Sequence, residues 1–96
     1  MSRFVLVTGA SRGSGRAIAI QLAQDGFEIV IHCRSNIEKA QETADQIKEL
    51  GRECRILSFD ISNRSQCKEL IEKDMLENGA YYGVVCNAGI CKDIPF

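Results

Sequence analysis

The chain alternates between short apolar runs and longer amphipathic segments. Four apolar runs rich in β-branched residues occupy positions 4–7, 29–31, 56–59 and 84–86. These runs are continuous rather than alternating, which is typical of strands buried on both faces of a parallel sheet. Their starts recur about every 25 to 27 residues, the spacing of successive βαβ units. The pattern therefore predicts four parallel strands.

The segments between these runs have helical periodicity and end at glycines. We expect helices over 13–25, over 36–50, and from Ser62 or Asn63 to 78. Ser35 and Glu38 have the spacing of a capping box at the start of the second helix. The predicted apolar stripes are Ala17, Ile18, Leu22 and Ala23 in the first helix, Ile37, Ala40, Ala44 and Ile47 in the second, and Cys67, Leu70, Ile71 and Met75 in the third.

Right-handed crossovers determine how these elements assemble. The expected fold is α/β, a three-layer Rossmann-type half-domain with strand order 3-2-1-4. The first two helices should cover one face of the sheet and the third helix the other. Since the only proline is Pro95 and no linker composition appears, residues 1–96 form one domain and no second domain is expected. Ligands of such sheets bind at the carboxyl ends of the strands, where the strand order reverses.

A glycine-rich segment lies where the first strand turns into the first helix. It reads Thr8-Gly9-Ala10-Ser11-Arg12-Gly13-Ser14-Gly15, with the spacing G-x-x-x-G-x-G. Glycines let the backbone approach a ligand closely, and the amides of a helix N-terminus attract a pyrophosphate. A tight strand-to-helix turn without a ligand is the alternative, and the position after the first strand of a βαβ unit favours a dinucleotide.

The end of the second strand distinguishes the two nicotinamide dinucleotides. An acidic residue there would bind the ribose 2′-hydroxyl of NAD, but the chain reads His32-Cys33-Arg34-Ser35. The guanidinium of Arg34 suits a 2′-phosphate, and Arg12 in the glycine segment could form the other half of a cationic clamp. This pair favours NADP(H), although either arginine alone could simply be solvated.

Two further segments follow the third and fourth strands. Asp60 could accept a hydrogen bond from an adenine amino group, or it could instead interact with the start of the third helix. The small residues of Asn87-Ala88-Gly89 would leave room for a cofactor ribose, although a lone N-A-G sequence could be any turn.

Composition and charge exclude several classes of function. Hydrophobic residues make up 45% and charged residues 26%, which is typical of a folded globular protein rather than a disordered one. Twelve basic and 13 acidic residues give a net charge of −1, so nucleic-acid binding is not expected. No apolar run approaches the length of a membrane span, and the N-terminal run is too short for a signal peptide. We therefore expect a cytoplasmic protein with no membrane partner.

The five cysteines do not form a metal-binding pattern. They occupy positions 33, 54, 67, 86 and 91, without a C-x-x-C pair and with one distant histidine at position 32. No zinc site has this spacing. Small apolar packing residues, kept reduced in the cytosol, are the expected role.

The ordered combination of Thr8-Gly9-x-x-x-Gly13-x-Gly15, Asp60 and Asn87-Ala88-Gly89 resembles the short-chain dehydrogenase/reductase family over the whole chain. The amino-acid sequence of the glycine-rich segment, together with Arg12 and Arg34, is most similar to the 3-oxoacyl-[acyl-carrier-protein] reductase branch of this family. Ser14 departs from the pattern, because the family generally has an aliphatic residue there. The resemblance implies that the cofactor is bound by Gly9, Ser11, Arg12, Gly13, Ser14, Gly15, Arg34, Asp60, Ile61, Asn87, Ala88 and Gly89.

The same resemblance implies that residues 1–96 are the N-terminal, cofactor-binding part of a longer reductase. The catalytic Ser and Tyr-x-x-x-Lys of the family are expected beyond residue 96, so no catalytic residue and no metal ligand is assigned within the chain. Tyr81 and Tyr82 do not fit the motif, because Val85 and Cys86 stand four residues later. The chain alone should be inactive.

The complete protein would reduce a β-ketoacyl thioester of acyl carrier protein with NADPH, in fatty-acid-type synthesis, as a homotetramer. Three alternatives remain open: a reductase of the same family acting on another ketone or alcohol, a nucleotide-binding module without catalysis, and a protein-interaction domain with a degenerate glycine segment.

Overall fold

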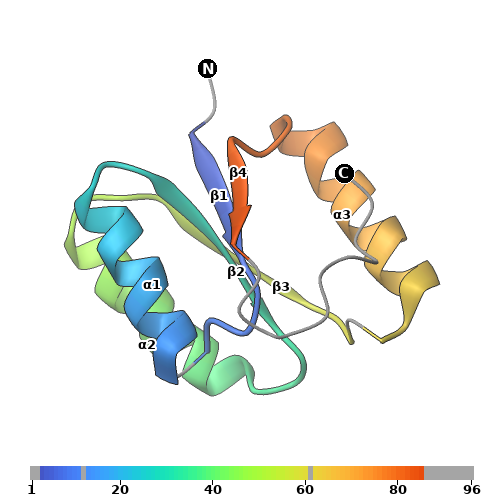
Figure 1. Cartoon of the computed structure of the whole chain (residues 1–96), viewed down its shortest axis with the longest axis horizontal. Helices are drawn as coiled ribbons and strands as arrows, with labels where there is room; N and C mark the ends of the chain where they lie inside the picture. Colours follow the sequence, from blue (N-terminus) through green and yellow to red (C-terminus); the bar gives the residue numbers. More distant parts are fainter. Residues whose placement is uncertain (1–2, 12, 61, 86–96) are drawn as a thin grey trace.

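The computed structural model describes residues 3–11, 13–60 and 62–85. Strands and helices alternate along the chain, as the hydrophobic pattern predicts (Figure 1). The elements are β1 (Phe4–Val7), α1 (Gly13–Gln24), β2 (Glu28–Cys33), α2 (Ile37–Glu49), β3 (Cys54–Ser58), α3 (Arg64–Asn78) and β4 (Gly83–Val85).

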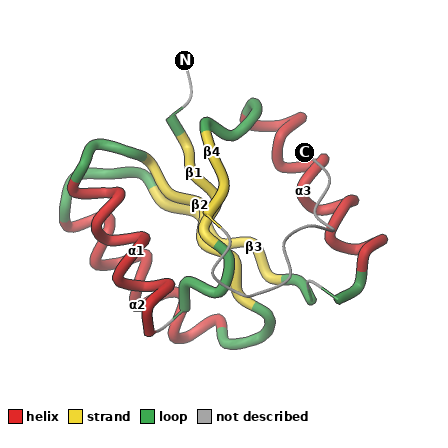
Figure 2. The backbone as a smooth tube through the Cα atoms, viewed as in Figure 1, coloured by secondary structure: helices red, strands yellow, loops and turns green. Residues whose placement is uncertain are grey.

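The four strands form one parallel sheet in the order β3-β2-β1-β4, which confirms the predicted topology. Val7 of β1 pairs with Ile31 of β2 on one side and with Val85 of β4 on the other. The carboxyl ends of β1, β2 and β4 therefore lie side by side. Helices α1 and α2 cover one face of the sheet and α3 covers the other, also as predicted (Figures 1 and 2).

Side-chain alternation along the strands divides the core into two layers. On the α1 and α2 face, the buried side chains are Val5, Val7, Ala10, Ala19, Ala23, Ile29, Ile31, Cys33, Ala40, Ala44 and Ile47. On the α3 face they are Leu6, Val30, Phe59, Cys67 and Ile71. Because β1 and β2 supply residues to both layers, their runs are continuously apolar, as the sequence pattern predicts for strands buried on both faces.

The predicted strand bounds were partly wrong. Strand β3 begins at Cys54, two residues before the apolar run, and ends at Ser58, one residue before the end of that run. It includes Arg55 because the guanidinium lies over the Phe4 ring, 4.1 Å from its centroid, and pairs with Asp74. Phe59 lies beyond the strand but is buried in the α3 layer.

The helix faces also need correction. In α1 the buried residues are Gly15, Ala19 and Ala23, whereas Ala17 is exposed. A stripe of small residues at every fourth position lets α1 approach its neighbours closely, and this determines the face more strongly than the positions of Ile18 and Leu22, which are only half-buried.

The start of α2 differs from the predicted capping box. Asn36, not Ser35, is the N-cap, and its side chain accepts a hydrogen bond from the Lys39 amide. As a result the helix begins at Ile37, whose side chain is exposed rather than part of the apolar stripe. The third helix starts where the sequence predicts, with Asn63 as its N-cap, whose side chain accepts from the Gln66 amide.

Candidate functional site

The glycine-rich segment leaves β1 through two residues that require glycine. Gly9 has φ +63° and Gly13 has φ +64°, both in the left-handed region that residues with a Cβ rarely adopt. A Cβ built on Gly13 would meet no atom within 4 Å, so the requirement there is conformational and not steric. The turn aims the N-terminus of α1 at the carboxyl edge of the sheet, where its first amides lack helical acceptors.

Two side chains, those of Thr43 and Arg16, form hydrogen bonds with carbonyl groups of the glycine-rich segment. The Thr43 hydroxyl on α2 donates to the Ala10 carbonyl at 3.0 Å. Arg16 donates from Nε to Thr43 Oγ1 at 2.8 Å and from Nη2 to the Ser11 carbonyl at 2.6 Å. Because Thr43 already accepts from Arg16, its hydroxyl proton is directed to the backbone of the turn. These contacts fix the carbonyl groups of Ala10 and Ser11.

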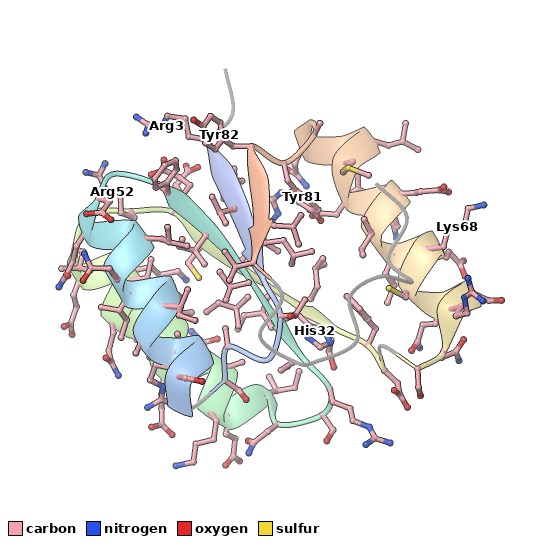
Figure 3. All side chains as sticks on the ribbon, in the orientation of Figure 1. Arg3, His32, Arg52, Lys68, Tyr81 and Tyr82 are labelled. Atoms are coloured by element: carbon pink, nitrogen blue, oxygen red, sulfur yellow. The ribbon has the colours of Figure 1, made fainter. Side chains whose placement is uncertain are left out.

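His32, near the end of β2, links this strand to the segment that follows β1. The Gly9 amide donates to His32 Nδ1 at 3.1 Å, and the Ala10 amide donates to the His32 carbonyl at 3.1 Å. On its other side, His32 Nε2 lies 2.8 Å from the Phe59 carbonyl. Figure 3 places His32 toward the end of the sheet away from Arg3 and Tyr82. One side chain thus connects the residues that follow β1 and β3.

Arg34 and Asp60 form an ion pair beside these contacts. Arg34 Nη2 lies 3.3 Å from Asp60 Oδ2, and the arginine side chain is 77% exposed. Asp60 also accepts from the amide and the hydroxyl of Ser62, at 2.9 and 2.7 Å. These Ser62 bonds, followed by the charge of Arg34, hold the pKa of Asp60 below its ordinary value. The carboxylate is therefore ionised at neutral pH and available as an acceptor at the sheet edge.

The structure brings together those predicted site residues that it describes. Gly15 is buried, Gly9, Ser11 and Asp60 are half-buried, and Gly13, Ser14 and Arg34 are exposed, all in segments that follow β1, β2 or β3. Asp60 accepts from Ser62 just before α3, in line with an interaction at the start of the third helix, while its role toward an adenine amino group stays a prediction. The remaining predicted residues, Arg12, Ile61, Asn87, Ala88 and Gly89, lie outside the described residues.

Sequence reasoning missed Arg16, His32 and Thr43. Each acts through a partner more than 20 residues away or through a loop carbonyl, and local patterns do not encode such contacts. Two signals were present nonetheless. Thr43 is a polar residue on the otherwise apolar stripe of α2, and His32 is a titratable residue that extends a buried apolar run.

The tyrosines lie at the other end of the sheet. Tyr81 and Tyr82 precede β4, so they are at the amino edge. Tyr81 donates to Asp74 Oδ2 at 2.7 Å, and burial together with this contact raises its pKa well above the ordinary value. Tyr82 packs against Phe27, with ring centroids 5.3 Å apart. Neither phenol lies near the glycine turn, in agreement with their exclusion as catalytic groups.

The cysteines of the described residues are not paired with one another. Cys33, Cys54 and Cys67 are unpaired thiols, and burial raises the pKa of each, that of Cys54 to about 12. Among the described residues no group of three His, Cys, Asp or Glu side chains could hold a metal, and no helix is long and apolar enough to cross a membrane. A hollow of about 390 Å³ lies at the amino edge, lined by Phe4, Lys48, Arg52, Glu53, Cys54 and Arg55.

The described residues fit the adenosine and pyrophosphate half of a nicotinamide dinucleotide. The turn carbonyls are bound by Thr43 and Arg16, which leaves the helix N-terminus as the electropositive side of the turn. Arg34 presents an exposed guanidinium after β2, and Asp60 presents a carboxylate after β3. Among the described residues, the arrangement offers candidate partners for the phosphates and the adenine of such a ligand.

Comparison with known proteins gives consistent matches. The profile of the short chain dehydrogenase family matches residues 3–96. The chain is 52% identical over its entire length to a 3-oxoacyl-[acyl-carrier-protein] reductase of Aggregatibacter actinomycetemcomitans, and covers 40% of that protein. It is 37% identical over 93 residues to the enzyme of the same name from Staphylococcus epidermidis, with 97% of the chain and 38% of that protein covered.

Solved structures agree with these matches. The fold superposes on acetoin dehydrogenase from Salmonella typhimurium with a TM-score of 0.82 at 32% identity, covering 93% of this chain and 37% of that one. Carveol dehydrogenase from Mycobacterium avium, solved in complex with NAD, gives a TM-score of 0.79 at 28% identity, with 92% and 36% covered. The chain thus spans about two-fifths of the length of the relatives it matches.

Proposed function

Because the chain belongs to the short-chain dehydrogenase family, we propose that it is the nucleotide-binding half of an NADPH-dependent 3-oxoacyl-[acyl-carrier-protein] reductase. The substrate class rests on the 52% identity to a reductase of that name over the whole chain. The proposal includes an acyl-carrier-protein thioester as the substrate partner and a homotetramer as the assembly of the complete protein.

The observation that carries the cofactor preference is the cation at the end of β2. Arg34 occupies the segment where an NAD-binding site has a carboxylate for the ribose 2′-hydroxyl. Its guanidinium is 77% exposed and pairs only at the surface with Asp60, so it can exchange that contact for a 2′-phosphate. Asp60 keeps a second anchor on Ser62 and remains oriented to accept from an adenine amino group.

The glycine turn supports the same proposal at the pyrophosphate. Gly9 and Gly13 permit the backbone path, and Thr43 and Arg16 hold the turn carbonyls, so that little rearrangement is needed on binding. When bound, the dinucleotide would supply a hydride to the β-keto carbon. The proton for the resulting alkoxide must come from a positioned acid, which the resemblance expects beyond residue 96.

A second candidate is a reductase of the same family that acts on a simple ketone or alcohol. Two of the structural relatives are named for acetoin and carveol, although their identities of 32% and 28% are well below the 52% of the carrier-protein reductase.

One kinetic comparison separates these possibilities. The longest protein that contains this chain would be assayed for loss of reduced-nicotinamide absorbance with a β-ketoacyl thioester, and in parallel with acetoin-type ketones. We expect turnover of the thioester, with kcat/KM at least about tenfold higher for NADPH than for NADH, the value of one charge-assisted contact. Turnover of simple ketones alone would favour the second candidate, and a preference for NADH would refute the cofactor assignment.

A further inference from the structure

His32 is a buried histidine that neither the glycine pattern nor the arginine clamp accounts for. It is 3% exposed and extends from β2 into the α3 face of the sheet, where its ring packs on Phe59 with centroids 4.3 Å apart. A histidine in such a layer could be a packing residue. Both of its ring nitrogens, however, contact backbone groups that flank the candidate nucleotide site.

The partners of the ring determine its protonation state. A backbone amide can only donate, so the Gly9 amide at 3.1 Å requires an unprotonated Nδ1. The ring proton is then on Nε2, which donates to the Phe59 carbonyl at 2.8 Å. His32 is therefore a neutral Nε2–H imidazole that links Gly9, the first residue of the glycine turn with positive φ, to the residue before Asp60.

We propose that His32 is a positioning residue for the nucleotide site, whose neutral ring fixes the Gly9 amide and whose protonation releases the glycine turn and weakens nucleotide binding. This inference rests on the proposed function, because it assumes that the turn binds the pyrophosphate. A protonated Nδ1 would place two donors face to face, so the Gly9 contact would be lost and the turn would no longer be held in its binding conformation.

The surroundings of the ring agree with a neutral state at physiological pH. Burial lowers the pKa of His32 below 6.5, and this outweighs the Phe59 carbonyl and the charge of Asp60, which both raise it. Arg34, two residues after His32, forms an ion pair with Asp60. From α3, the buried titratable side chains are the Cys67 thiol, whose pKa burial raises, and Asp74, which pairs with Arg55. Protonation is thus expected only at acid pH, below the ordinary histidine range.

Two substitutions separate positioning from packing. In His32→Asn the side-chain oxygen can take the place of Nδ1 and accept from Gly9, whereas His32→Leu fills the space without an acceptor. We expect the Asn variant to bind NADPH within about threefold of wild type at pH 7.5, and the Leu variant to bind about tenfold more weakly, as expected for one buried amide left without its acceptor. Equal affinities of the two variants would overturn the proposal.

The pH profile supplies a second readout. The 2′-phosphate of NADPH itself titrates near pH 6, as phosphate monoesters do, so the wild-type profile must be compared with that of His32→Asn. We expect wild type to lose more affinity between pH 7 and 5 than the Asn variant does. Identical profiles would overturn the proposal. Failure of wild type to bind either nucleotide would overturn the proposed function and this inference together, whereas binding with the wrong variant order overturns only the role of His32.

A spectroscopic measurement covers the case in which the variants fold poorly. Because the 96-residue sequence contains one histidine, the ¹⁵N-histidine signals of that chain belong to His32 and are assigned without the variants. At pH 7.5 we expect a neutral ring with its proton on Nε2, and a Gly9 amide signal that shifts as the ring titrates. A proton on Nδ1, or a charged ring at that pH, would overturn the proposal without any ligand present.

Discussion

Replacement of Arg34 by alanine should weaken binding of NADPH and leave binding of NADH nearly unchanged. Arg34 follows β2 directly, and its guanidinium is within 3.3 Å of Asp60 Oδ2 while most of the side chain remains in solvent. The 2′-phosphate is the only group that distinguishes the two dinucleotides, so a residue that binds it must affect one ligand selectively. Removal of the cation also leaves the Asp60 carboxylate facing that phosphate, which adds repulsion.

The magnitude follows from the exposure of Arg34. Hydrogen bonds to charged groups contribute about 1.5 to 3 kcal/mol. The guanidinium is 77% exposed and must give up its contact with Asp60, so the lower limit applies. About 1.5 kcal/mol corresponds to a roughly tenfold increase in the Kd of NADPH. Arg34→Asp, which introduces the carboxylate typical of NAD sites, should go further and reverse the preference toward NADH.

The assay is a titration of each reduced dinucleotide, followed by calorimetry or nicotinamide fluorescence, at fixed ionic strength. Arg3→Ala is the matched control, because Arg3 is also an exposed arginine but lies at the amino edge, over the Phe27 ring (Figure 3). The control should leave both Kd values within about twofold, since surface charges this far apart are screened. If Arg34→Ala changed the two Kd values equally, or changed neither, Arg34 would not contact the 2′-phosphate.

Three further outcomes are expected. Gly13→Ala should lower the free energy of unfolding by about 1–2 kcal/mol, because Gly13 has a positive φ, and should weaken nucleotide binding. Gly13→Asn, which tolerates this conformation, should lower the melting temperature less. Equal losses of stability in the two variants would contradict the conformational argument. Asp74→Ala should destabilise the protein by about 3 kcal/mol, because it leaves Arg55 without its bidentate partner at 2.8 Å; a change below about 1 kcal/mol in urea unfolding would show that the pair is not needed. Burial raises the pKa of Asp74, but the hydrogen bonds from Arg55 and Tyr81 outweigh it and hold the pKa below the ordinary value. The stabilisation is therefore complete above about pH 4 and is lost as the pH falls through the lower folded-state pKa, so the wild-type melting temperature should fall below pH 4 more steeply than that of Asp74→Ala. Finally, the 96-residue chain alone should not oxidise NADPH with a β-ketoacyl thioester, since the tyrosines of its described part lie at the amino edge of the sheet, away from the glycine-rich segment. Turnover in the usual range of about 1 to 10³ per second would place the catalytic groups within this chain.

Hydrophobic pattern and chain connectivity were sufficient to predict the fold. Continuous apolar runs indicated four strands of a parallel sheet, and right-handed crossovers then determined both the strand order and the faces covered by α1, α2 and α3. The ends of a strand were less predictable where the strand contains a polar residue. Arg55 belongs to β3 only because Phe4 and Asp74, both distant in sequence, accommodate its guanidinium.

The residues of the candidate site also fall into those that the sequence pointed to and those that it did not. Gly9, Gly13, Arg34 and Asp60 were predictable, because they follow predicted strands and their residue types suggest a local chemistry. His32, Arg16 and Thr43 were not predicted, since their role depends on tertiary hydrogen bonds to the glycine turn. The N-cap at Asn36 is a smaller example: Ser35 and Asn36 are both good capping residues, and the structure uses the second.

The most direct test of the nucleotide site is a crystal structure of the whole protein with NADPH. We expect the pyrophosphate to lie against the segment that contains Gly9, Gly13 and Gly15, the 2′-phosphate within hydrogen-bond distance of the Arg34 guanidinium, and the adenine amino group at Asp60. A nucleotide bound elsewhere, such as the hollow at the amino edge beside Phe4 and Arg52, or a 2′-phosphate turned away from Arg34, would contradict it.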